Sequence, residues 1–205
     1  GITLNTLNDP TSAGQPINNA GVTLKSGTAS IAGGNINIAA YETTTDSAIY
    51  GFNGQITMTA YGADINLGTL ANPIYGGAGL NSNPLGTLTA TKVAGIGGNI
   101  SIYATATAAG NYAFQNSGNI VASGDVTIVA NSTTGTAISN TGTISGASIS
   151  ITGTSTTAST IVALAGMTVN SGGGNLTVVA NNTSAGSNTG ITQTGNVVSN
   201  ASGGS

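Results

Sequence analysis

Seven charged side chains are all that this chain of 205 residues contains, and any acid–base or metal chemistry must be assembled from them. They are Asp9, Lys25, Glu42, Asp46, Asp64, Lys92 and Asp125, and the sequence has no His, Cys or Arg. Catalysis by proton transfer and metal binding need several such groups held close together. Glu42 and Asp46 form the only close acidic pair, but no third ligand or base accompanies them. We therefore expect a solvated loop there.

Asp64 and Asp125 stand at one repeated position, directly before an apolar–polar–apolar segment. Other copies of the segment have a short polar residue at this position: Asn35, Asn99, Ser148 and Asn175. Short side chains that hydrogen-bond the backbone are typical of turns, so we expect a structural role for both aspartates.

The stretch GGAGLNSNP at 76–84 is similar to a glycine-rich calcium repeat, but Asn81 replaces the aspartate and the motif occurs once. We expect a loop there. No catalytic, metal or cofactor site is predicted, and we expect that the protein is not an enzyme.

The charge balance also limits the partners. With two lysines and a formal net charge of −3, the chain has almost nothing with which to neutralise nucleic-acid phosphates or an anionic membrane surface. No apolar run approaches the roughly 18 residues of a membrane-spanning helix. The opening residues GITLN lack a basic-then-apolar signal segment, so we expect a mature or excised N-terminus.

The elements that would position any site follow from a repeat. Seven segments share the apolar–polar–apolar pattern, at spacings between 23 and 35 residues: GITLNT, NINIAA, DINLGT, NISIYA, DVTIVA, SISITG and NLTVVA. Their alternation predicts strands with one apolar face. Between the apolar residues lies a polar outer ladder of small side chains: Thr3, Asn37, Asn66, Ser101, Thr127, Ser150 and Thr177.

A second pattern lies between these strands. AIYGFNGQIT, AFQNSGNIVA, AISNTGTIS and GITQTGNVVS each place a short turn ending in glycine between two apolar residues. We expect Gly54, Gly118, Gly142 and Gly195 to adopt positive φ at these turns. Each repeat thus has about three short strands, and stacked repeats would bury a continuous core.

The fold predicted is all-β: a parallel β-solenoid, expected to be a right-handed β-helix of about seven coils with three short strands per coil. An antiparallel β-sandwich is the alternative, although sandwiches do not need the same motif at every pass. Disorder is disfavoured by the regular β-branched content.

The ends of the sequence match each other. Joining NASGGS to GITLNT reproduces the run NSGGG–NLTVVA found inside the chain. Neither end carries a capping helix, a proline or a charge cluster of the kind that blunts sheet edges. We therefore expect end-to-end stacking through Ile2, Thr3, Leu4, Val197 and Val198. Its partner would be either further β-helix of the same chain or a second copy of this subunit.

The repeats SGGGNLTVVANNTSAGSNTGITQTGNVVS and ASGDVTIVANSTTGTAISNTGTIS resemble those of filamentous-haemagglutinin-like exoproteins, which belong to the two-partner and autotransporter class of bacterial surface proteins. The resemblance extends over nearly the whole chain and implies a secreted β-helix that acts as a fibrous shaft or adhesin. That family's Asn-Pro-Asn secretion signature is absent, and Asn83-Pro84-Leu85 matches it only in part. No functional residue is carried over from the family.

Composition divides the single segment 1–205 into two regions. All tyrosines and phenylalanines fall within 41–114, where the coils are longest, whereas 126–205 contains no charged residue. We expect a plain shaft surface in the second region. In the first, the candidate lateral or ligand contacts are Tyr50, Phe52, Tyr75, Tyr112 and Phe114. The alternative is that several of them, especially Phe52 and Phe114, only fill wider coils.

The predicted function is that of a structural, adhesive shaft outside the cell or at its surface, in a bacterium. A filament subunit and a module that binds a host or environmental glycan are the alternatives. Thr57/Thr59 and Thr89/Thr91 suggest an ice-binding threonine ladder, but Val121/Ser123 interrupts it in the next coil.

Overall fold

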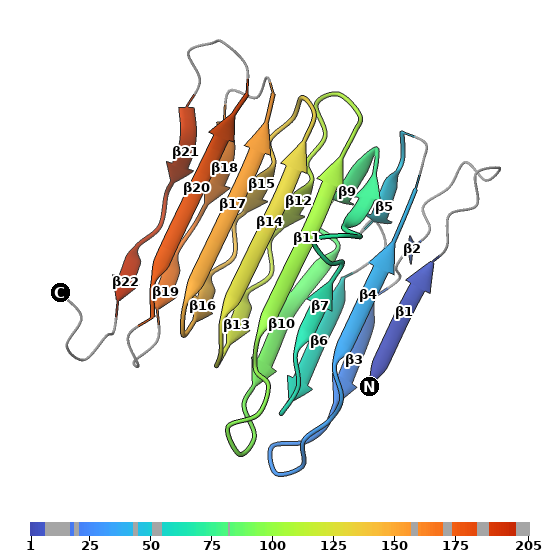
Figure 1. Ribbon diagram of the computed structural model, residues 1–205, viewed down its shortest axis with the longest axis vertical. Helices are drawn as coiled ribbons and strands as arrows, with labels where there is room; N and C mark the ends of the chain where they lie inside the picture. Colours follow the sequence, from blue (N-terminus) through green and yellow to red (C-terminus); the bar gives the residue numbers. More distant parts are fainter. Residues whose placement is uncertain are drawn as a thin grey trace.

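A computed structural model describes residues 1–6, 17–18, 21–42, 45–50, 55–81, 83–156, 160–169, 174–183 and 189–199. Within these ranges the ordered elements are β-strands, which form three sheets named A, B and C here. All strand pairs between the named strands are parallel (Figure 1).

In spatial order, sheet A contains β1 (Ile2–Thr6), β4 (Ile36–Ala40), β7 (Ile65–Leu67), β11 (Ile100–Ala106), β14 (Val126–Ser132), β17 (Ile149–Ser155) and β20 (Leu176–Asn182), with β8 (Ile74–Gly76) also paired to β11. Sheet B contains β2 (Ile17–Asn18), β5 (Ser47–Tyr50), β9 (Ala78–Asn81), β12 (Phe114–Asn116), β15 (Ile138–Asn140), β18 (Thr160–Leu164) and β21 (Thr189–Gln193). Sheet C contains β3 (Val22–Ser26), β6 (Ile56–Tyr61), β10 (Leu85–Thr91), β13 (Ile120–Ala122), β16 (Ile144–Gly146), β19 (Met167–Val169) and β22 (Val197–Ser199).

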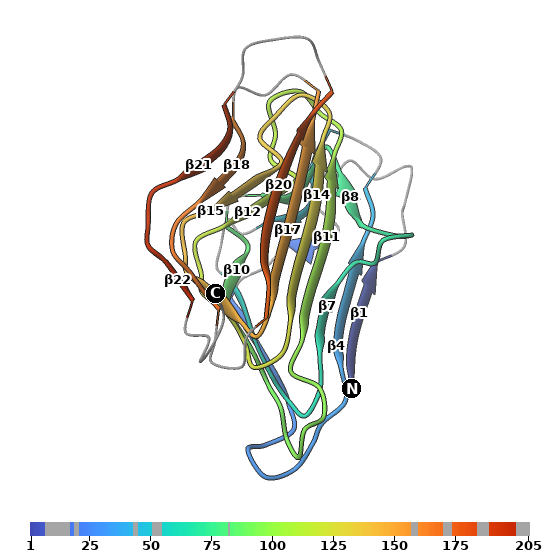
Figure 2. The same ribbon diagram turned by 60° about the vertical axis from the view of Figure 1, so that its left-hand side comes forward.

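The chain visits the three sheets in the order A, B, C and then returns to A one strand further along. Each circuit is one coil, so coil 1 contains β1–β3 and coil 7 contains β20–β22. Figure 2 shows sheet A on one side of the molecule and sheet B on the other. The predicted all-β parallel β-helix of seven coils with three strands per coil is confirmed, and coil 3 has a fourth described strand because both β7 and β8 belong to sheet A.

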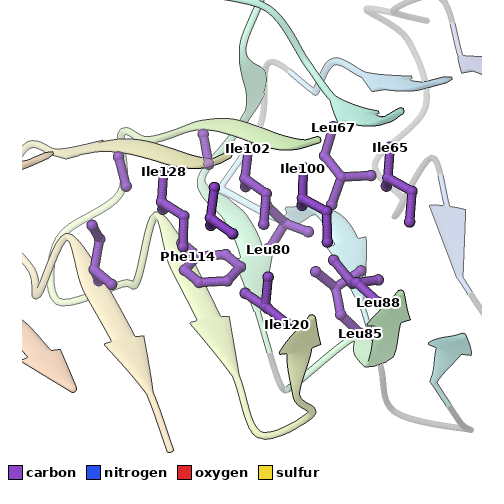
Figure 3. Packing of buried hydrophobic residues seen from close by; sticks show 14 of the residues in the cluster. Ile65, Leu67, Leu80, Leu85, Leu88, Ile100, Ile102, Phe114, Ile120 and Ile128 are labelled. Atoms are coloured by element: carbon purple, nitrogen blue, oxygen red, sulfur yellow. The ribbon is translucent and has the colours of Figure 1, made fainter. Parts of the chain in front are cut away.

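The alternation in the sequence explains which side chains enter the core. In coils 2–6 the apolar residues of the repeated apolar–polar–apolar motif in sheet A point inward and are buried, whereas the residues that alternate with them are at least partly exposed. Figure 3 shows Ile100 and Ile102 of sheet A facing Leu85, Leu88 and Ile120 of sheet C across a narrow interior. A continuous aliphatic column therefore runs along the axis.

Phe114 belongs to this column. Its ring is fully buried and lies beside Leu80, its neighbour in sheet B (Figure 3). The prediction that Phe114 makes lateral or ligand contacts is wrong, because its place on the inward face of β12 leaves the ring no access to solvent. Phe114 instead fills the core of the solenoid, in line with the alternative.

The turn glycines act differently from the expectation. Gly118, Gly142 and Gly195 do not have positive φ, and Gly54 lies outside the described residues. A Cβ atom added to Gly118 would collide with the carbonyl oxygen of Gly86, and one added to Gly142 would collide with the carbonyl oxygen of Gly118. These glycines are therefore needed because the backbones of successive coils approach closely at the corner between sheets B and C.

The glycine column can be tested by comparing two glycine-to-alanine variants at this corner. Gly142→Ala should lower the free energy of unfolding by about 1–3 kcal/mol, because overpacking forces the backbone of coil 5 away from coil 4. Gly166→Ala is the matched control in coil 6, since its Cβ would find no atom nearer than 3.4 Å. Urea unfolding followed by circular dichroism measures both. Equal stability of the two variants would contradict the steric explanation.

Candidate functional site

The outer face of sheet A carries the predicted polar ladder. Its seven residues occupy one register row through all coils: Thr3, Asn37, Asn66, Ser101, Thr127, Ser150 and Thr177. Within the row, Asn66 Nδ2 donates to Asn37 Oδ1 at 2.9 Å. Uncharged side chains can stack at the close spacing of adjacent strands without the repulsion that like charges would cause.

The two aspartates that precede strands of sheet A are bound into a second row. Asn35 Oδ1 accepts the backbone N–H of Asp64 at 2.9 Å, and Asp64 Oδ1 accepts that of Asn99 at 3.0 Å. Asn99 Oδ1 in turn accepts the backbone N–H of Asp125 at 2.9 Å. Each side-chain oxygen thus reaches the next coil rather than its own turn, so Asp64 joins two coils.

An amide pair inside the solenoid was not identified from the sequence. Asn116 and Asn140 are almost fully buried at one register position of sheet B. Asn116 Nδ2 donates to Asn140 Oδ1 at 2.9 Å and to Gly118 O at 2.7 Å, and Asn140 Nδ2 donates to Gly142 O at 2.6 Å. The AFQNSG and AISNTG repeats contain these asparagines, so their equal spacing from the turn glycine was the available signal.

The acidic pair is arranged differently from the prediction. Glu42 is only 3% exposed, and its backbone N–H donates to Tyr75 O at 2.8 Å. A solvated position is therefore wrong for Glu42, because the close pairing of Tyr41 and Tyr75 draws the chain against coil 3. Asp46 is partly exposed. Nowhere in the described part of the chain do three possible metal-ligating side chains come together.

The glycine-rich stretch at 76–84 is not a loop as expected. It contributes the end of β8 and all of β9, and its first five residues are buried. A Cβ on Gly77 would collide with the backbone of Thr45, and one on Gly79 would lie 2.5 Å from Ala113 O. Glycine is therefore required by close packing between coils.

The threonine pairs do not form the ladder that the sequence suggested. Thr59 pairs with Thr89, but an irregularity between Leu85 and Leu88 shifts the register. Thr91 consequently faces Tyr61 rather than a threonine.

The remaining aromatic candidates separate into two groups. Tyr75 is half-buried on the outer face of sheet A, and its ring stacks on that of Tyr41 with centroids 4.7 Å apart. Tyr112 is also half-buried. Phe52 and the side chain of Tyr50 lie outside the described residues. Tyr41 and Tyr103, which the sequence prediction missed, stand on the same outer face as Tyr75.

Both ends of the solenoid expose side chains that are buried elsewhere. In coil 7 the inward positions of sheet A are partly exposed at Leu176, Val178 and Ala180, and Ile191 of β21 is 42% exposed. Their register partners in coil 6, such as Ile151 and Val162, are fully buried. We call the inward side chains of coil 7 the C-terminal end face.

The predicted stacking residues lie at these ends, with one distinction. Ile2, Thr3 and Leu4 belong to β1, an edge strand of sheet A, and Val197 and Val198 belong to β22, an edge strand of sheet C. Val197 pairs with the buried Met167 and continues the inward row, whereas Val198 pairs with Thr168 of the outward row. Of these two valines, only Val197 therefore belongs to the C-terminal end face.

No protein family, no curated protein and no solved structure matches this chain. Among the described residues there is also no helix of the length and apolarity that a membrane span requires.

The hydrogen bond that Asp64 accepts from Asn99 gives a prediction that distinguishes a structural role of this side chain from a role of its negative charge. Asp64→Asn should leave the free energy of unfolding unchanged, because the amide oxygen can still accept the N–H of Asn99, as Asn35 and Asn99 do in their own coils. Asp64→Ala should lower the free energy of unfolding by about 0.5–1.5 kcal/mol, since one hydrogen bond is lost. Thermal and urea unfolding test both variants. Destabilisation by Asp64→Asn as large as by Asp64→Ala would show that the negative charge itself matters.

Proposed function

We propose that this chain is a segment of a structural and adhesive β-helical shaft, in which the end coils dock onto further β-helix. The exposed inward side chains at the two ends carry this proposal: the C-terminal end face and, in coil 1, an N-terminal end face formed by Ile2, Leu4, Val22 and Leu24. In the interior coils the inward apolar row is fully buried, but at Val197 the same row is 51% exposed. Apolar surface of this kind is favourably removed from water by a coil of matching pattern.

The backbone supports the same contact. β20, β21 and β22 are edge strands of the three sheets, and all three lie at the same end of the solenoid (Figure 1). An edge strand offers a row of N–H and C=O groups to which another strand can add. At interior junctions the N–H of Ile149 donates to Asn175 O at 2.8 Å. Leu176 holds the equivalent position in coil 7, so its N–H would donate to the pre-strand residue of an added coil.

The opposite end has the complementary pattern. Ile2 pairs with Ile36 and Leu4 with Ile38, so β1 already has the register that every other strand of sheet A uses. Val22 and Leu24 continue the inward row of sheet C at this end, and Val22 is exposed. A strand like β1 placed on β20 would extend both the aliphatic column and the polar outer row.

The composition supports a shaft rather than a catalyst. Sheet A presents hydroxyl and amide groups outward, and the carboxylate of Asp64 accepts a hydrogen bond from the next coil. Together with the resemblance of the repeats to filamentous-haemagglutinin-like exoproteins, this favours a secreted or cell-surface protein of a bacterium. The proposed partner is flanking β-helix of the same protein.

The alternative is a separate subunit that polymerises head to tail, and the same end faces favour it. The two possibilities differ in the mass of the native polypeptide after full denaturation. A mass near the 19.6 kDa of this sequence would support separate subunits. A mass many times larger would support one stretch of a long repeat protein.

Docking through the end faces can be tested with two adjacent valines of β22. Val197→Lys should abolish end-to-end association of the purified chain, because it places a charge in the column that an added coil would bury. Val198→Lys is the matched control, since this valine is 41% exposed but faces outward. Sedimentation velocity and electron microscopy would measure association and particle length. Circular dichroism would confirm that both variants remain folded.

Two results would contradict the proposal. One is a wild-type chain that stays a single solenoid at high protein concentration. The other is equal loss of association in both lysine variants, which would point to lateral contacts instead of end-face docking.

A further inference from the structure

The strands of sheet A carry no charged side chain on their described outer face, and Asp64 and Asp125 lie just before β7 and β14. Three tyrosines gather on this face. Tyr41 and Tyr75 lie on adjacent coils as register partners, and their rings are nearly parallel, with 12° between the planes. Tyr103 lies on β11, two residues before Thr105, which pairs with Tyr75. Tyr103 is thus a diagonal neighbour of Tyr75 on the same face. Tyr41 is 42% exposed, and the other two tyrosines are half-buried.

A short loop stands beside these rings. β7 pairs with Ile100–Ile102 of β11 and β8 pairs with Ala104–Ala106, so residues 68–73 leave the sheet at the level of Tyr103. Figure 2 shows this segment projecting outward between β7 and β8. The loop is closed by hydrogen bonds from Thr69 N to Asn72 O at 2.9 Å and from Asn72 N to Thr69 Oγ1 at 3.0 Å. It forms a raised border next to the tyrosines.

On the side of Tyr75 that faces coils 4 and 5, the outer-face side chains are smaller. The row that contains Tyr41 and Tyr75 continues as Thr105 and then Asn131, whose side chain is exposed. Beside the large rings, Thr105 therefore offers a hydroxyl group and Asn131 an amide group. Hydroxyl and amide groups both donate and accept hydrogen bonds.

This combination has a specific chemistry. A pyranose ring has C–H faces that pack against an aromatic ring, while its hydroxyls need donors and acceptors at the edge of the contact. The described strands of sheet A have no cationic side chain on this face, so an anionic sugar would find no counter-charge there. We propose that Tyr41, Tyr75 and Tyr103 form a stacking platform for a neutral saccharide, with the 68–73 loop as its border and Thr105 and Asn131 as polar contacts. The platform does not depend on docking at the end faces.

The experiment is a titration of the 205-residue chain with hexasaccharides, in which calorimetry and tyrosine fluorescence measure binding. The neutral probes are cellohexaose, maltohexaose, xylohexaose and chitohexaose, and the anionic probe is hexagalacturonate. We expect saturable binding of at least one neutral hexasaccharide, with a change in tyrosine fluorescence and weaker or absent binding of hexagalacturonate.

Variants assign the binding to the platform. Tyr75→Ser and Tyr103→Ser should each raise Kd about tenfold, which corresponds to about 1.4 kcal/mol. Tyr75→Phe should retain most of the affinity because the ring remains. Tyr61→Ser is the control on sheet C, where the Tyr61 ring lies 5.7 Å from Lys25 Nζ, and it should not change Kd.

The proposal is overturned if no neutral hexasaccharide binds, if hexagalacturonate binds more tightly than all of them, or if Tyr61→Ser weakens binding as much as Tyr75→Ser. End-to-end association of the Tyr75→Ser variant should equal that of the wild type. The platform and the end faces can therefore fail independently.

Discussion

Parallel, in-register pairing of each coil with the next is the constraint on which the rest of the structure depends. Because every strand of a sheet has the same direction and the same register, a residue meets the equivalent residue of the neighbouring coil at a fixed close spacing. This rule favours small neutral side chains outside, aliphatic side chains inside and minimal bulk at the corners. The outer row from Thr3 to Thr177, the core column and the glycines at 86, 118 and 142 are three consequences of it.

The same constraint explains how polar groups are satisfied. Asp64 and Asn99 accept backbone N–H groups of the following coil, and Asn116 bonds to Asn140 within the interior. Each of these bonds depends on repetition, since the partner is the same position one coil away. A buried amide without such a partner would cost stability, so the Asn116–Asn140 pair favours correct stacking of coils 4 and 5 as well as stability.

In a fold whose coils are stabilised by stacking on one another, the apolar side chains and edge strands of the end coils remain partly exposed. Among the described residues, the inward side chains and the edge strands of coil 7 have a neighbouring coil on one side only, and the proposed shaft function rests on this exposure. The outer faces, in contrast, are complete in each coil. Variation there, such as the three tyrosines and the 68–73 loop, changes the surface without changing the core, so ligand recognition can be added to a structural scaffold.

The sequence by itself determined the architecture, because strict alternation at Ile36/Ile38 or Val126/Ile128 and the repetition of that motif depend only on local chemistry. It also determined the outer polar row and the scarcity of positive charge, since the chain has only two lysines. Tertiary structure alone decided whether an aromatic side chain points inward or outward: Phe114 fills the core, whereas Tyr75 stacks on Tyr41. It also decided the role of the turn glycines and the burial of Glu42, since both arise from contacts with residues one coil away. The physical reason is that the repeat spacing varies between 23 and 35 residues. The sequence therefore does not show which corner residues of successive coils lie against each other, and only the strand pairing of the folded chain brings their backbones into contact.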